Sequence, residues 1–140
     1  MQNLFEIDEW KIIETKFDPS RQEQAESIFS FGNGSFGQRA NFEEDYSGKT
    51  LQGSYVGGVY YPDKTRVGWW KNGYPEYFAK VLNACNWTGI RIEIDGESLD
   101  LAKAEIKHFY RELDMQNGLL TRKFRCVLSN GKEVDVHSMR

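Results

Sequence analysis

The chain contains 140 residues, of which 39% are hydrophobic and 28% are charged, and this balance is typical of a single soluble globular domain. Its net charge of −3 at pH 7 argues against nucleic acid or an anionic membrane surface as the main partner. No window approaches the ~20 apolar residues of a membrane span, and residues 1–14 lack the basic and apolar segments of a secretory signal. We therefore expect a cytoplasmic protein without nucleic-acid or membrane partners.

The amino-terminal part of the chain predicts one strand followed by a short helical turn. The segment Trp10–Phe17 has the β-branched and aromatic content of a strand, and Asp18–Ser20, which includes a proline, ends it. The mostly polar segment Arg21–Glu26 is compatible with a short turn of helix. The first strand of a sheet is therefore expected at Trp10–Phe17.

The segment Glu26–Glu44 is the most informative stretch of the chain. Two apolar portions, Ile28–Phe31 and Phe36, flank the Gly-Asn-Gly turn at Gly32–Gly34. Glycine and asparagine tolerate positive φ angles at little steric cost, so they favour a tight turn at this position. The segment therefore predicts two short buried strands joined by a tight loop, and a run of acidic residues follows them.

The middle of the chain predicts a strand interrupted by glycines and then a second buried segment. Thr50–Tyr61 has the composition of a strand in which Gly53 and Gly57–Gly58 indicate a bulge or a close approach of another backbone. Pro62–Asp63 is expected to end this strand. After an aromatic loop, Phe78–Asn86 returns to the pattern of a buried segment.

The last fifty residues predict a series of β-hairpins. Apolar residues alternate with polar ones along Ile90–Leu101, with the two-residue turn signal Asp95–Gly96 at the centre. Further strands are expected at Ile106–Asp114 and Glu133–Ser138, and Asn117–Gly118 supplies another turn. The side chains expected to share one face of the strand between them are Leu120, Phe124, Cys126 and Leu128, with Arg122 as an exception. This pattern predicts an all-β protein whose antiparallel sheet buries one face.

The acidic run Glu43–Asp45 raises the question of a glycosidase acid and base pair, whose carboxyl groups lie about 5 to 10 Å apart. Adjacent residues of a strand point to opposite faces, so Glu43 and Glu44 cannot both face one sugar. We expect these carboxylates to be solvated or to pair with Arg39. No catalytic residue is therefore predicted within this chain.

Metal and thiol chemistry are not predicted either. His108 and His137 lack a third ligand at metal-binding spacing. Cys85 and Cys126 form no C-x-x-C motif, and both are expected to be buried thiols. We therefore expect no metal site and no bound cofactor.

Several ordered motifs resemble those of one enzyme family. They are ESIFSFGNGSFGQRANFEE at Glu26–Glu44, GSYVGGVY at Gly53–Tyr60, NACNW at Asn83–Trp87, RELD at Arg111–Asp114 and GLLTR at Gly118–Arg122. With these motifs the chain resembles the start of glycoside hydrolase family 65, which includes maltose, kojibiose and trehalose phosphorylases and related hydrolases. The likeness extends over nearly the whole chain.

The resemblance implies an antiparallel β-sandwich, the N-terminal portion of a galactose-mutarotase-like supersandwich. Residues 1–140 would be an incomplete, non-catalytic domain, and the catalytic helical barrel would lie beyond Arg140. The parent enzyme would act on α-glucosidic disaccharides, with inorganic phosphate as co-substrate in a phosphorylase and water in a hydrolase. The motif residues that the resemblance implies are structural are Asn33, Gly34, Gly37, Arg39, Asn41 and Glu43.

The loop Thr65–Tyr77 is the strongest candidate for contact with a partner. Its candidate residues facing a carbohydrate or another domain are Trp69, Trp70, Lys71, Asn72 and Tyr74. An aromatic face stacks well on the apolar face of a pyranose, but tryptophan and tyrosine are also enriched at protein interfaces. The interpretation we favour places this loop against the catalytic barrel or a second subunit, and the alternative is a stand-alone carbohydrate-binding module.

The final segment, Glu133–Arg140, predicts a strand whose outer edge has no partner. Val134 and Val136 share one face of it. An unpaired edge and a partly uncovered apolar face favour association with another molecule. We therefore expect a homodimer with a two-fold contact.

Overall fold

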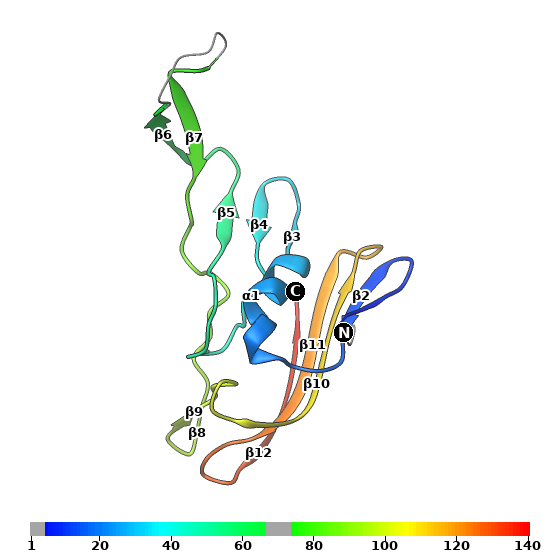
Figure 1. Ribbon diagram of the computed structural model, residues 1–140. Coiled ribbons are helices and arrows are strands. Elements are labelled where there is room, and N and C mark those ends of the chain that lie inside the picture. The colour runs from blue at the N-terminus through cyan, green and yellow to red at the C-terminus, as the bar shows by residue number, and fades with distance from the viewer. Residues whose placement is uncertain (1–4, 67–73) are drawn as a thin grey trace.

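The computed structural model describes residues 5–66 and 74–140, and most of its regular structure is antiparallel β-sheet (Figure 1). The main sheet has five strands in the order β1-β2-β10-β11-β12. Their bounds are β1 Phe5–Ile7, β2 Lys11–Glu14, β10 Glu105–Asp114, β11 Leu119–Val127 and β12 Glu133–Met139. The predicted all-β antiparallel sandwich is thereby confirmed.

The second layer covers one face of this sheet with short elements. The short elements outside the main sheet are the 3-10 turn Pro19–Arg21, helix α1 Gln22–Ile28, strands β3 Phe31–Gly32, β4 Phe36–Gln38 and β5 Ser54–Val56, and the hairpin β8 Glu93–Ile94 with β9 Glu97–Ser98. Strands β6 Tyr60–Lys64 and β7 Tyr77–Val81 form a separate ribbon that projects away from the body (Figure 1). Within the described part of the chain, no helix has the length and apolar character needed to span a membrane.

The strand β11 carries the alternation that the sequence predicts. The inward side chains Leu120, Phe124 and Cys126 are buried, and Arg122 is buried among them. Phe124 on β11 stands directly opposite Phe109 on β10. Because the side-chain period of a strand is two, this register keeps every second residue on the face that the second layer covers.

The inward face holds two separate apolar clusters. One is centred on Phe42, Leu99, Leu101, Phe109, Phe124, Cys126 and Leu128. The other contains Ala25, Phe29, Ala40, Leu113 and Leu120. Burial of a large apolar side chain stabilises a fold by roughly 1.5 to 3 kcal/mol, so these clusters hold the two layers together.

The predicted pair of buried strands at Ile28–Phe31 and Phe36 is only partly correct. Helix α1 continues through Ile28, because Ala25 and Phe29 lie one helical turn apart and both are buried on the same side. The hairpin is formed by β3 and β4 alone, and Phe36 is 53% exposed. Burial of the α1 face therefore outweighed the strand propensity of these aromatic residues.

The region expected to be buried at Phe78–Asn86 is in fact exposed. Val81 is 66% exposed and Leu82 is 43% exposed, because β7 pairs only with β6 in a two-stranded ribbon. Cys85 is also exposed, whereas Cys126 is buried as predicted. Pro62–Asp63 does not end the preceding strand but lies within β6, since a ribbon of two strands leaves an edge where proline needs no hydrogen-bond partner.

The turn between β10 and β11 depends on glycine. Gly118 has a φ angle of +66°, which an L-amino acid side chain rarely adopts. We expect Gly118→Ala to lower the free energy of unfolding by about 1 kcal/mol or more, measured by urea denaturation. Gly37→Ala is the control, because Gly37 lacks a positive φ and a Cβ there meets only Tyr55 Cβ at 4.0 Å. A neutral Gly118→Ala variant would contradict this explanation.

Candidate functional site

The hairpin turn at the start of the family motif is held by its own asparagine. Asn33 Oδ1 accepts hydrogen bonds from the backbone amides of Ser35 at 3.0 Å and Phe36 at 2.9 Å. Gly34 has a φ of +86°, and Gly37 pairs with Tyr55 in the neighbouring strand. These contacts are those of a rigid turn, and the structural role of this part of the motif stays a prediction.

The next motif residues join helix α1 to the segment before β5. Arg39 Nη2 donates to the carbonyl of Glu23 at 2.8 Å, and Arg39 Nε donates to that of Leu51 at 2.8 Å. Asn41 Nδ2 donates to the same Leu51 carbonyl at 3.1 Å, and Asn41 Oδ1 accepts from the amide of Gly53 at 3.2 Å. These side chains therefore connect backbone segments within the domain.

Glu43 and Glu44 converge on one buried arginine. Arg122 Nη1 donates to Glu44 Oε1 at 2.6 Å, Arg122 Nη2 donates to Glu43 Oε2 at 2.5 Å, and Arg140 Nε lies 2.7 Å from Glu43 Oε1. The expectation that these carboxylates are solvated or paired with Arg39 is therefore wrong. The argument from opposite strand faces also fails, because Glu43 and Glu44 lie in a bend outside any strand.

Charge compensation dominates the electrostatics of this group. Burial alone would raise the pKa of Glu43, but the charges of Arg122 and Arg140 outweigh it and lower that pKa. Burial likewise opposes the charge of Arg122, yet Glu44 and Glu43 raise its pKa. The guanidinium carbon of Arg122 also lies 4.4 Å from the ring centroid of Phe42. Glu43 and Arg122 are therefore held in their charged forms.

A second buried ion pair, which the sequence pattern did not predict, lies beside this group. Arg111 donates to Glu14 Oε2 from Nε at 2.8 Å and from Nη2 at 2.6 Å, and both side chains are 1% exposed. Burial raises the pKa of Glu14 and lowers that of Arg111, and each partner offsets part of the shift of the other. The sequence signal that indicates such a pair is an ionisable residue at an inward position of a strand. Glu14, Arg111 and Arg122 occupy such positions and stand opposite one another in register.

These buried groups are not arranged for catalysis. The Glu43 and Glu44 carboxylates are occupied by guanidinium donors on the inner side of the sheet, so neither is free to serve as a general acid or base. The described residues contain no group of three or more potential metal ligands, and His108 and His137 stand as separate, exposed strand residues. The buried carboxylates and arginines therefore act as structural ion pairs.

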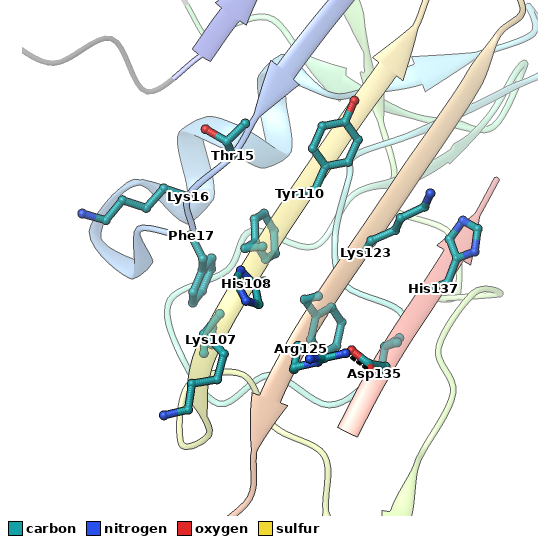
Figure 2. Close-up of a pocket in the computed structure, with 14 residues that line it drawn as sticks. Thr15, Lys16, Phe17, Lys107, His108, Tyr110, Lys123, Arg125, Asp135 and His137 are labelled. Carbon is teal, nitrogen blue, oxygen red and sulfur yellow. Dashed lines mark hydrogen bonds and ion pairs between the residues drawn. The ribbon is translucent and has the colours of Figure 1, made fainter. Parts of the chain in front are cut away.

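The outer face of the main sheet forms a broad, shallow hollow of about 930 Å³ (Figure 2). Figure 2 shows Tyr110, Lys123 and His137 side by side on three neighbouring strands, with Arg125 paired to Asp135 below them. Burial and a hydrogen bond to Glu112 raise the pKa of Tyr110 to about 12. The mixed polar lining of this hollow is that of a solvated sheet face, and we assign no ligand to the hollow.

The ribbon formed by β6 and β7 carries much of the exposed aromatic surface. Its exposed aromatic residues are Tyr60 at 56%, Tyr61 at 56%, Tyr77 at 51% and Phe78 at 45%. Tyr74, one of the predicted contact residues, is 44% exposed. The other four, Trp69, Trp70, Lys71 and Asn72, lie outside the described residues. The ribbon thus presents an aromatic surface that the described part of the domain leaves uncovered.

The chain is similar to several known proteins over almost its whole length. Residues 12–140 match the model of the glycosyl hydrolase family 65 N-terminal domain. The chain is 52% identical to maltose phosphorylase from Bacillus subtilis (strain 168) and 33% identical to alpha,alpha-trehalose phosphorylase from Thermoanaerobacter brockii, over 99% and 98% of its residues. A solved structure from the human microbiome, provisionally named kojibiose phosphorylase, is 35% identical over 97% of the chain with a TM-score of 0.83.

The fold and the motif contacts define an antiparallel β-sandwich domain, and the comparisons agree with this class. The chain belongs to glycosyl hydrolase family 65 and corresponds to its N-terminal domain. It spans only 18% of the length of the maltose phosphorylase, of the trehalose phosphorylase and of the solved structure. The resemblance seen in the sequence motifs is therefore confirmed.

Arg122 provides a direct test of the buried network. Its removal leaves two buried carboxylates with too few partners, so Arg122→Met should lower the free energy of unfolding by about 3 to 5 kcal/mol. Arg125→Met is the matched control: it lies on the same strand and pairs with Asp135, but its side chain is 44% exposed, so a loss of at most about 1 kcal/mol is expected. Urea midpoints would measure both, and equal small losses would contradict the assigned role of the network.

Proposed function

We propose that this chain is the non-catalytic N-terminal domain of an enzyme that phosphorolyses α-glucosidic disaccharides. The observation that carries this proposal is the family 65 match over residues 12–140, together with relatives named as phosphorylases. Inorganic phosphate would be the co-substrate, and no other cofactor is proposed. A hydrolase is the alternative outcome for the parent enzyme, with water in place of phosphate. A cytoplasmic location is part of the proposal and rests on the sequence alone.

The domain would act by supporting a catalytic helical barrel that follows residue 140 in the parent chain. In this proposal residues 1–140 are part of a larger N-terminal β-sandwich, and the ribbon of β6 and β7 contacts the barrel or borders its sugar site. The exposed aromatic residues of that ribbon support this role, since aromatic side chains are enriched where protein surfaces meet. The same surface would serve a stand-alone carbohydrate-binding module, which is the second candidate function.

Maltose is the first substrate to test for the parent enzyme. The chain is 52% identical to a maltose phosphorylase, and it is 33% and 30% identical to a trehalose and a kojibiose phosphorylase from Thermoanaerobacter brockii. The groups that select a disaccharide would lie in the barrel, so this ranking rests on overall similarity alone.

Catalysis offers the simplest test of this proposal. We expect residues 1–140 alone to release neither glucose nor glucose 1-phosphate from maltose, kojibiose, nigerose or trehalose, with or without phosphate, because their motif carboxylates are held in ion pairs. A longer chain that includes the following domain should release glucose 1-phosphate only when phosphate is present. Turnover by residues 1–140 that is lost in Glu43→Gln or Glu44→Gln would contradict the proposal.

We also propose that the chain forms a homodimer through the free edge of the main sheet. Strand β12 is the last in the sheet order, and Met139 on it is 66% exposed. Unpaired strand edges favour pairing with a second copy, and a lysine on such an edge opposes it. Sedimentation at tens of micromolar should therefore show a dimer that Met139→Lys weakens. A monomer at that concentration would contradict the proposal.

A further inference from the structure

A small pocket outside the ribbon has the composition of a sugar site. It has a volume of about 300 Å³ and lies between the β3–β4 hairpin, the loop that carries Trp87 and the turn at Gly118. Its lining consists of aromatic residues, glycines and two amide side chains, Asn33 and Gln38, with no charged side chain among the residues that form it. This size is at the lower end of small-molecule pockets, and the neutral lining disfavours a charged ligand.

Two half-exposed rings form the apolar wall of this pocket. Phe36 is 53% exposed and Trp87 is 45% exposed. Their ring centroids lie 6.1 Å apart with an interplanar angle of 64°, an edge-to-face arrangement that fixes each ring against the other. The pair thus offers a preformed apolar corner, in contrast to the buried rings of Phe29 and Phe42.

A buried amide supplies a polar group beside these rings. Gln38 is only 8% exposed, and its Nε2 donates to Thr88 Oγ1 at 3.0 Å. Asn86 Oδ1 also accepts from the amide of Thr88 at 3.2 Å, so the loop that holds Trp87 is fixed against β4. No donor among the described residues reaches Gln38 Oε1, which leaves this oxygen able to accept a hydrogen bond from a ligand hydroxyl.

The backbone beneath the rings is also rigid. A Cβ at Gly32 would lie 2.5 Å from the carbonyl oxygen of Phe36, so only glycine fits at that position. The Asn33 amide donates to the same carbonyl at 3.1 Å, and Asn33 Oδ1 accepts from the Phe36 amide. The wall that carries Phe36 is therefore fixed before any ligand binds, which reduces the ordering cost of binding.

We propose that this pocket binds one pyranose ring of a neutral saccharide. The apolar face of the sugar would pack on Trp87 and Phe36, and a hydroxyl would donate to Gln38 Oε1. The aromatic corner, the neutral lining and the acceptor-bearing amide carry this inference to a pyranose. The choice of an α-glucoside as its source rests on the proposed function. No residue of strands β6 and β7 lines this site.

Titration of residues 1–140 with maltose tests the proposal. We expect millimolar binding, read from the Trp87 indole and Gln38 amide signals in two-dimensional NMR spectra. Trp87→Ala and Phe36→Ala should each weaken binding about tenfold or more, a change of about 1.4 kcal/mol. Tyr60→Ala is the matched control, because Tyr60 is 56% exposed but lies on the ribbon, and it should leave the affinity unchanged. Thermal melts would confirm that each variant is folded.

The remaining outcomes separate this inference from the proposed function. Glucose 1-phosphate should bind no tighter than maltose, because no charged side chain lines the pocket. Absence of Trp87 shifts at 100 mM maltose, or binding that persists in Trp87→Ala, would overturn the sugar site. Shifts confined to the ribbon would assign binding there instead and would equally overturn it. All of these readouts measure binding by residues 1–140, so they do not depend on turnover by the parent enzyme.

Discussion

The fold depends on a row of charges that crosses the inner face of the main sheet. Glu14, Arg111 and Arg122 stand opposite one another on β2, β10 and β11, between the two apolar clusters, and the uncharged Ser138 stands opposite Arg122 on β12. Two arginines directly opposite each other repel, so the row is stable only when carboxylates cover it. Glu14 neutralises one end, and Glu43 and Glu44 reach Arg122 from the segment that crosses above the sheet. This requirement fixes the second layer over the first.

Such a network is costly to bury and constrains the structure strongly. Apolar residues in the same positions can be equally stable or more stable, but they would fit several registers of the crossing segment. The bidentate geometry of Arg122 with Glu44 accepts only one arrangement, since planar guanidinium and carboxylate groups must align. We infer that these charges specify where residues 41–44 lie. That placement also positions Phe42 in the larger core cluster.

The same constraint separates the buried charged groups of the domain from its exposed aromatic groups. The motif residues Glu44, Arg111 and Arg122 are turned inward, where they form ion pairs that hold the layers together. The exposed aromatic surfaces lie elsewhere, on the ribbon of β6 and β7 and at the corner formed by Phe36 and Trp87. A domain of this kind can present apolar surface to a sugar or to another domain without taking part in bond cleavage.

The sequence alone determined the antiparallel strands β10, β11 and β12, their turns and the family, because period-two alternation and turn residues such as Asn117–Gly118 are local signals. It also marked Arg122 as an exception on its strand. It did not predict the partners of Glu43 and Glu44, because Arg122 is 78 residues from Glu44 and a contact over that separation leaves no local pattern. Nor did it predict the exposure of Val81, since an apolar strand is buried only if another layer covers it. Tertiary structure decided which charges meet and which apolar residues remain uncovered, because both depend on packing between segments far apart in the chain.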